Sequence, residues 1–543
     1  MRILSSLPLS NLLAIAPVSR RFYRLASDSQ LWKLLYYRRF VLPRAMRIPG
    51  FREGPAYGAT PDGGRGHKLH YTGRRALWAD GKRGGLVGEQ TSPGKARDEG
   101  ELVDWKRQYK IRHNWSRGRC AVEELKMGRG VEVRDDARDA KMLVKVVEGI
   151  AVTADAVSGL RAWDLRTRKL LAEVGLSETG DAATPTCIAI DDHALGDSHL
   201  DVAVGFFDGG FGIWRFDFSS NKLARRYRHE KSSNGELVGI AYSYPYILTA
   251  TVSVLASLYT FDGPPGQPPT AKAAHSHRQP RDNPGRGKPP LLCPYLLTSL
   301  QSHTSRPPLA LSIRKLASSA IASIAYTFST RKGWSIGIQN LHIQAAPATG
   351  ASSAPEVTST RLAYTGPLTG GRLSGGSPSS PVLPASETHL EPPSNENTPD
   401  RLDPGPTSLC YTHPYLLATL PDNTLVLYLC TSNASTLTVS PGIRLWGHTS
   451  GISDAEITAR GKAVSVSSRG DEMRVWELEG RPAALHGRSV EIRPNKEGGG
   501  EEVGGGGPEW DERRNWVGFD DEMVIVLKES RGGGESLMVY DFT

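Results

Sequence analysis

The chain has 543 residues, more than one compact hydrophobic core usually holds, so a small module joined to a larger domain is expected. Its apolar content of 38% is low, which predicts that part of the chain is disordered. The net charge of +9 is uneven, because residues 1–119 hold 24 Lys and Arg against 9 Asp and Glu and the remainder is slightly acidic. The basicity therefore belongs to the N-terminal region, which we interpret as a solvated arm rather than a nucleic-acid-binding surface.

The cysteines exclude several classes of protein. The five of them, at positions 120, 187, 293, 410 and 430, are at least twenty residues apart and form no C-x-x-C pair. This spacing excludes the common zinc sites and a disulfide framework, and it predicts a reducing compartment, the cytoplasm, the nucleus or both.

No run of eighteen apolar residues occurs, so no membrane partner is expected. The apolar run after Arg2 resembles a targeting peptide, but Pro8, Ser10 and Asn11 interrupt it, so no targeting peptide is predicted.

The first forty residues predict four short amphipathic helices. Ser10 is a candidate N-cap for a helix over 11–16, and Asp28 or Ser29 can cap the last helix. Two apolar stripes recur at helical spacing, namely Val18, Phe22, Leu25, Ala26 and then Leu31, Trp32, Leu35, Tyr36. Helices this short cannot bury both stripes by themselves, so they need a partner.

Residues 18–40, VSRRFYRLASDSQLWKLLYYRRF, closely resemble the second half of an F-box. The resemblance implies that residues 1–40 are a partial F-box that docks the Skp adaptor of a cullin ubiquitin ligase. It also implies the adaptor-binding positions Ile3, Leu4, Leu7, Pro8, Leu12, Leu13, Ile15 and Val18. F-boxes usually open with a Leu-Pro-x-Glu segment, which is missing before Met1-Arg2-Ile3. We expect a start assigned too far downstream, with a real loss of the segment as the alternative.

Two segments follow the helices. Residues 41–100 are rich in Gly and Arg without apolar periodicity, which predicts a disordered insertion. Residues 101–130 are expected to form a helical linker, with order resuming at Val103 and a helical pattern over 104–111. Its Trp105, Tyr109, Asn114 and Trp115 resemble the connecting helices of F-box/WD-repeat proteins.

From about residue 131 to 543 the chain repeats short β-rich runs separated by turn residues. Seven approximate copies lie at 149–165, 187–217, 237–262, 295–338, 408–429, 447–477 and 516–541. Repeats of this length predict a WD-like β-propeller, with seven blades favoured over six or eight. Because the chain ends on a strand, we expect residues 120–147 to close the last blade, through either Val131–Arg134 or Leu143–Val147. Three Pro-, Ser- or Gly-rich tracts, at 263–290, 346–407 and 494–510, are predicted to be flexible loops.

No motif for bond-making chemistry emerges. Gly287-Lys288 is followed by Pro289, so no P-loop is present, and Thr449 stands where a nucleophile elbow needs Ser. His448 is better explained as a blade-stabilising hydrogen-bond donor than as a catalytic group. The basic run Arg225–Arg228 is expected on the rim, as a solvated outer strand of the second blade, with a site for a phosphorylated peptide as the alternative. We predict a protein without enzymatic activity, cofactor or metal.

The expected fold is therefore mainly β, a short helical F-box followed by a C-terminal propeller. The expected function is that of a substrate-recognition subunit of a Skp–cullin–F-box ubiquitin ligase, with the adaptor, the cullin scaffold and a target protein as partners. A propeller scaffold that recruits no ligase is the alternative. The sequence identifies neither the target nor the residues that bind it.

Overall fold

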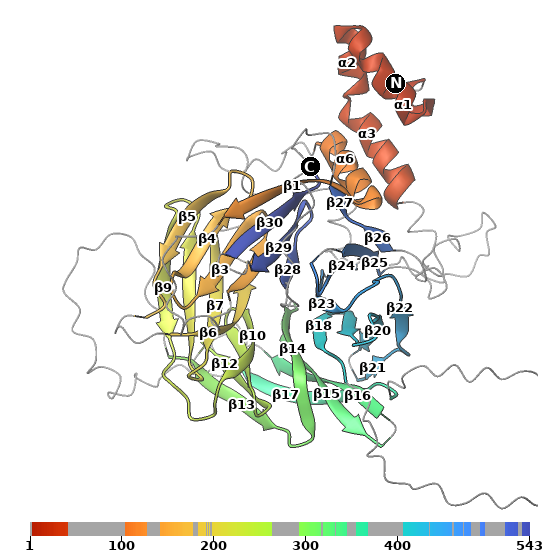
Figure 1. Ribbon diagram of the computed structural model, residues 1–543. Coiled ribbons are helices and arrows are strands. Elements are labelled where there is room, and N and C mark those ends of the chain that lie inside the picture. The colour runs from red at the N-terminus through yellow and green to blue at the C-terminus, as the bar shows by residue number, and fades with distance from the viewer. Residues whose placement is uncertain are drawn as a thin grey trace, which may run out of the picture.

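The computed structural model describes two kinds of structure, a group of short helices and a ring of β-sheets (Figure 1). The described residues are 3–41, 104–126, 142–177, 183–191, 193, 195, 198–262, 293–316, 319–331, 333–344, 355–367, 405–433, 435–458, 461–470, 472–478, 489–494, 516–529 and 535–543. The predicted insertion at 41–100 lies outside these residues apart from Val41, as do the loop at 263–290 and most of those at 346–407 and 494–510. No helix among the described residues is long and apolar enough to span a membrane.

The helices precede the ring in the sequence. They are η1 (Leu4–Ser6), α1 (Leu9–Ile15), η2 (Ala16–Val18), α2 (Arg20–Ala26), α3 (Ser29–Tyr36), the π-helical turn η3 (Tyr37–Val41) and α6 (Trp105–Arg117). Ser19 caps α2, and the carboxylate of Asp28 caps α3 by accepting from the amides of Gln30 and Leu31. The prediction that Ser10 is an N-cap is wrong, because α1 begins at Leu9 after Pro8.

Seven sheets form the seven blades of a β-propeller. The first three contain β2 (Leu143–Val147), β3 (Ile150–Asp155), β4 (Gly159–Asp164) and β5 (Lys169–Val174); β6 (Pro185–Asp191), β7 (His199–Phe206), β8 (Phe211–Asp217) and β9 (Lys222–Arg228); and β10 (Leu237–Ser243), β11 (Tyr246–Thr251), β12 (Leu255–Thr260) and β13 (Tyr295–Gln301).

The next three blades contain β14 (Ser305–Lys315), β15 (Ser319–Thr330), β16 (Gly333–Gln344) and β17 (Glu356–Tyr364); β18 (Ser408–Thr412), β19 (Tyr415–Thr419), β20 (Leu425–Ser432), β21 (Leu437–Val439) and β22 (Ile443–Leu445); and β23 (Ile452–Ile457), β24 (Lys462–Ser467), β25 (Met473–Glu477) and β26 (Ser489–Glu491). The seventh contains β28 (Trp516–Phe519), β29 (Met523–Glu529), β30 (Glu535–Asp541), β1 (Arg119–Lys126) and the short β27 (Arg493–Pro494).

The ring closes through a strand from the start of the propeller. β1 pairs antiparallel with β30, from Ala121 opposite Asp541 to Lys126 opposite Ser536. The closing strand therefore comes from 119–126, ahead of the expected boundary at residue 131. Leu143–Val147 is instead the first strand of the first blade, and Val131–Arg134 lies outside the described residues. Because β1 follows α6 directly, the segment that completes the ring also carries the helices.

Two further strands differ from the sequence prediction. The run at 295–299, expected to open the fourth blade, is part of β13, which pairs with β12 and completes the third blade. The fourth blade opens with β14, which the repeat pattern missed. Its last strand, β17, lies within the tract predicted to be a loop at 346–407, and it pairs with β16 from Gly337 opposite Tyr364 to Gln344 opposite Glu356.

Candidate functional site

The helices share a small hydrophobic core. Leu12, Leu31 and Trp32 are buried there together with Trp105 and Tyr109 of α6. The indole nitrogen of Trp32 donates to the Ala26 carbonyl oxygen at 2.6 Å, so the ring is held by a hydrogen bond as well as by packing. The N-terminal half of α6 is thus an integral part of the helical unit, defined as residues 3–41 together with α6.

The structure divides the eight predicted adaptor-binding residues into two groups. Leu4 and Leu12 are buried in the core of the helical unit, and Leu7 and Ile15 are half-buried. The side chains of Ile3, Leu13 and Val18 are 81%, 47% and 69% exposed, and Pro8 is also exposed. The exposed members can contact a partner without any change in the core of the helical unit.

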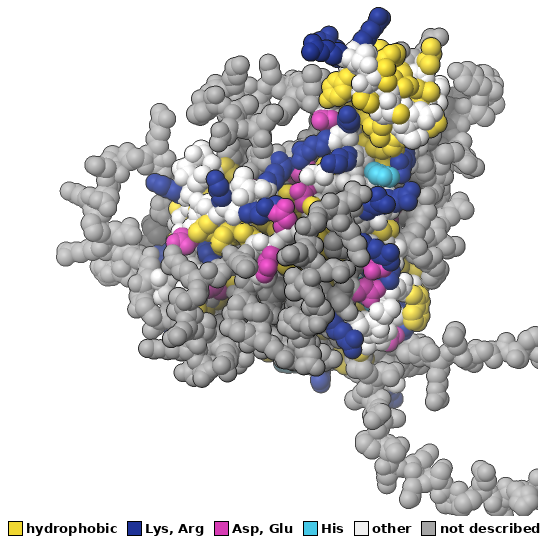
Figure 2. Space-filling model, turned by 45° about the horizontal axis from the view of Figure 1, so that its top comes forward, with side chains coloured by type: hydrophobic (Ala, Val, Ile, Leu, Met, Phe, Trp, Pro, Cys, Tyr) yellow, Lys and Arg dark blue, Asp and Glu magenta, His cyan; other side chains and the backbone are white. Residues whose placement is uncertain are grey.

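Two aromatic residues extend the exposed apolar surface. Phe22 is 42% exposed and Tyr23 is 57% exposed, both on α2 directly after Val18. The sequence pattern placed Phe22 on an apolar stripe, and the helical period identifies such a common face but not which of its residues are covered. We call Ile3, Leu13, Val18, Phe22 and Tyr23 the apolar patch, and Figure 2 shows hydrophobic side chains gathered on these helices.

The helical unit is strongly basic. It contains eleven Lys and Arg but only one acidic residue, Asp28, which caps α3; Asp104, directly before the unit's α6, caps that helix. Arg20, Arg21 and Arg24 of α2 are exposed beside the apolar patch. Figure 2 shows Lys and Arg side chains at the far end of this unit and again where it meets the propeller. The unit therefore offers an apolar surface within a positive field.

The C-terminal half of α6 is mounted on the propeller. The ring of Trp115 stacks on Phe542 with centroids 3.9 Å apart, and its indole nitrogen donates to the Asp521 carbonyl oxygen at 2.8 Å. The amide of Asn114 donates to the Phe542 carbonyl oxygen at 2.9 Å. The helix ends at Gly118 with φ +65°, where a Cβ would lie 2.0 Å from the Glu491 carbonyl oxygen, so only glycine fits this close approach.

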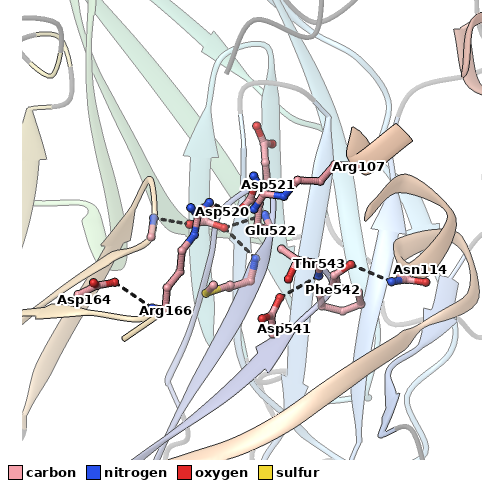
Figure 3. A network of polar contacts seen from close by, with 12 residues as sticks. Arg107, Asn114, Asp164, Arg166, Asp520, Asp521, Glu522, Asp541, Phe542 and Thr543 are labelled. Carbon is pink, nitrogen blue, oxygen red and sulfur yellow. Dashed lines mark hydrogen bonds and ion pairs between the residues drawn. The ribbon is translucent and has the colours of Figure 1, made fainter. Parts of the chain in front are cut away.

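Charged side chains join α6 to the place where the ring closes (Figure 3). One carboxylate oxygen of Glu522, in the β28–β29 turn, accepts from Arg107 of α6 at 3.0 Å and also contacts Arg166, in the β4–β5 turn. Next to it, the buried carboxylate of Asp520 accepts from the amide of Gly149 at 2.7 Å. The linker helix, the first blade and the last blade therefore meet at one polar centre, and α6, about 20 Å long, extends from there to the helices of residues 3–41.

His448 makes a hydrogen bond within its blade, in agreement with the structural role predicted for it. Its Nε2 lies 2.6 Å from the Ser465 hydroxyl oxygen, which also accepts from the indole nitrogen of Trp476 at 2.8 Å. The acid of this network is Glu472, whose carboxylate lies 3.5 Å from His448 Nδ1. Glu472 lies in the turn between β24 and β25, and its side chain reaches the histidine from there.

The basic run Arg225–Arg228 lies on β9, the outermost strand of the second blade, which agrees with the expected rim position. It is less solvated than expected. The guanidinium of Arg228 lies 3.5 Å from the centroid of Phe206 and pairs with Asp208 at 3.6 Å, and burial lowers its pKa. Arg228 is thus held within its blade.

The blades also present an end that faces away from α6. Because strands alternate in direction, the turns between second and third strands lie at the end opposite the β28–β29 turn that α6 contacts. These turns expose Val157, Phe207 and Val252 in three consecutive blades, and Trp446, before β23, is exposed at the same end. We call these four residues the far-end residues.

Comparison with known proteins matches both parts of the chain. A family model described as the β-propeller of F-box protein pof12 matches residues 120–543, and a model described as F-box-like matches residues 1–38. Similar solved structures include the C-terminal WD40 domain of Sif2 (10% identity, 78% of this chain and 98% of that chain, TM-score 0.34) and the Cps50 (Swd1) β-propeller domain of Myceliophteria thermophila (12%, 78% and 100%, 0.38). U3-55K is a third (8%, 77% and 98%, 0.38). No curated protein matches the sequence.

Proposed function

Because the chain belongs to the F-box protein pof12 β-propeller family, we propose that it is a substrate receptor of a Skp–cullin–F-box ubiquitin ligase. In this proposal the helical unit binds a Skp-type adaptor, and the propeller binds a target protein. The receptor makes and breaks no bond itself. It contributes proximity and orientation between the target and the ubiquitin-charged enzyme held by the cullin.

The observation that carries the proposal is the apolar patch on an F-box-like module. F-box-like domains in general interact with Skp-type adaptors, and this one leaves Ile3, Leu13 and Val18 largely exposed although its core is complete without them. Exposed side chains of this size stabilise a complex when a partner buries them. The surrounding Arg20, Arg21 and Arg24 favour an adaptor surface whose rim is acidic.

The packing of α6 against both parts of the chain supports a receptor in which the adaptor-binding helices and the target-binding propeller keep a constant relative position. The helix is packed into the helical unit through Trp105 and Tyr109 and into the propeller through Trp115. A target held by the far-end residues would then be presented at a defined distance from the adaptor. Val157, Phe207, Val252 and Trp446 favour a target segment with apolar side chains over one recognised by phosphate alone.

Adaptor capture by purified protein tests the proposal. The triple variant Ile3→Ala, Leu13→Ala, Val18→Ala removes about two side chains' worth of exposed apolar surface. Since burial of one such side chain is worth roughly 1.5–3 kcal/mol, we expect adaptor affinity to fall about 100-fold or more. The readout is the dissociation constant for a Skp-type adaptor from calorimetry, with thermal unfolding recorded for each variant.

A matched control truncates three exposed apolar residues of the propeller, Val157, Val252 and Leu316, to alanine. This variant should bind the adaptor like the unmodified chain. Equal adaptor affinity for the apolar-patch variant and the control, or no binding by the unmodified chain, would contradict ligase recruitment and favour a propeller scaffold. Adaptor binding at raised ionic strength tests whether Arg20, Arg21 and Arg24 contribute. If they do, the affinity for the adaptor should fall as the salt concentration rises.

A further inference from the structure

One face of α6 is open to solvent and basic. The helices of residues 3–41 and the propeller cover its other faces. The open face carries four residues at the helical spacings i, i+4, i+7 and i+11, namely Lys106, Lys110, His113 and Arg117. Lys110 and Arg117 are exposed, and Lys106 and His113 are half-buried. At 1.5 Å per residue this row is about 16 Å long.

Two exposed arginines from other elements extend this face. Arg39 of η3 donates to the Tyr109 hydroxyl oxygen at 2.6 Å, and its guanidinium lies 5.4 Å from the Tyr109 ring centroid, so Arg39 is held against α6. Arg119 is the first residue of β1, directly after the end of α6. Figure 2 shows Lys and Arg side chains gathered where the helical unit meets the propeller. We define the basic stripe as Arg39, Lys106, Lys110, Arg117 and Arg119.

The charge of the basic stripe is not balanced by carboxylates. None of its five residues forms an ion pair with an acid among the residues that the structure describes. Two acids at its borders are engaged elsewhere, since Asp104 caps α6 and Glu491 pairs with Arg493 at 2.8 Å. Burial, followed by the three arginines of the basic stripe, lowers the pKa of His113, so this imidazole is neutral at pH 7 and its charged neighbours are positive. The basic stripe therefore carries a charge of about +5.

We propose that the basic stripe binds a short acid-rich segment of a partner protein. Carboxylates pair with guanidinium and ammonium groups, and the planar guanidinium fork matches a carboxylate with two hydrogen bonds. An extended chain rises about 3.3 Å per residue, so about five residues cover the row on α6. The partner segment therefore needs about five consecutive residues, most of them Asp or Glu.

The surroundings of the basic stripe favour a short acidic segment over nucleic acid. Beyond Arg119, β1 exposes Glu123 and Glu124, and the part of the chain that forms the propeller is slightly acidic. A nucleic-acid duplex carries a charge about every 1.7 Å along its whole length, so it would continue from the basic stripe onto like charges. A segment of about five residues ends before it reaches them. The inference goes beyond adaptor binding, because the exposed Ile3, Leu13 and Val18 take no part in it.

Titration of the full-length chain with capped, fluorescent oligoglutamate peptides tests the inference. The series consists of di-, tetra-, hexa- and decaglutamate, and hexaglutamine is the uncharged control. We expect affinity to rise steeply up to hexaglutamate and only slightly beyond it, because the row on α6 is covered by about five residues. Hexaglutamine should not bind, and hexaglutamate binding should weaken as the ionic strength rises. Affinity that keeps rising steeply from hexa- to decaglutamate would overturn the inference.

A triple variant with a matched control separates the basic stripe from the general positive field of the protein. Lys110→Gln, Arg117→Gln, Arg119→Gln should weaken hexaglutamate binding about 10-fold or more, since each exposed charge pair contributes modestly and three are lost. The control is Lys169→Gln, Lys222→Gln, Arg331→Gln, which removes the same charge at exposed positions of the first, second and fourth blades. The control should bind hexaglutamate within about 2-fold of the unmodified chain. Equal losses in the two variants would overturn the inference.

A single variant keeps the test decisive if the triple variant folds poorly. Lys110 is exposed and Gln is a good helix former, so Lys110→Gln should fold normally and weaken hexaglutamate binding about 2- to 5-fold. Unchanged affinity in this variant would overturn the inference. A short DNA duplex is the competing probe, and duplex binding that is tighter than hexaglutamate binding and falls in the same variants would assign the basic stripe to nucleic acid instead. The Ile3→Ala, Leu13→Ala, Val18→Ala variant should bind hexaglutamate normally, which distinguishes this inference from adaptor binding.

Discussion

Replacing Trp115 by alanine is the most direct test of how the helices are mounted on the propeller. The side chain is 3% exposed and contacts Phe542, Phe519 and the ammonium group of Lys462, whose Nζ lies 3.7 Å from the ring centroid. Truncating a buried Trp costs about 3–5 kcal/mol, and the loss of its hydrogen bond to Asp521 adds about 1 kcal/mol. This is a large part of the roughly 5–15 kcal/mol that holds a typical domain folded.

The assay combines denaturant unfolding with hydrogen exchange read by mass spectrometry. If the whole propeller depends on this contact, the unfolding midpoint falls. If only the mount depends on it, exchange accelerates in 105–117 and at the C-terminus while the other blades stay protected. Trp446→Ala, at a 59% exposed position, is the control and should change stability by less than about 0.5 kcal/mol. Unchanged stability and unchanged exchange of α6 in Trp115→Ala would refute the mounted-helix description.

Two further predictions concern the blades. Ser465→Ala leaves the buried nitrogens of His448 and Trp476 without their common partner, so it should cost about 2 kcal/mol or more in denaturant unfolding, whereas the exposed Ser233→Ala should be neutral. Burial raises the pKa of Asp454 to about 7 from its ordinary 3.8; the residue lies near Lys145 and Glu456, on first strands of their blades. The contribution of Asp454 to the free energy of unfolding is therefore fully present below about pH 4 and is lost as the pH rises through 7. Asp454→Asn should therefore gain stability relative to the unmodified chain between pH 4 and 8, by at most about 4 kcal/mol; a difference that is constant with pH would contradict this.

Local patterns predicted much of the architecture. The residue pattern at 18–40 resembled the F-box. The β-rich runs separated by turn residues located most strands of the seven blades, because burial of one or both faces of a strand requires a pattern of apolar residues within about five to eight positions. The cap at Asp28 and the structural role of His448 were predictable for the same reason. Each depends on neighbours that are close in the sequence or on one short repeat.

Only the tertiary structure decided which segments meet. Nothing local distinguishes 119–126 from 143–147 as the strand that closes the ring, because the choice depends on register with β30, some four hundred residues later. The resemblance to an F-box grouped Ile3, Leu12, Leu13 and Val18 as adaptor-binding positions, but the packing of the helical unit determined that Leu12 is buried in its core while the others stay exposed. The proximity of Arg314, His342, Arg361 and His413 could likewise not be predicted from the sequence, since these residues come together only through strand pairing and the packing of one blade on the next.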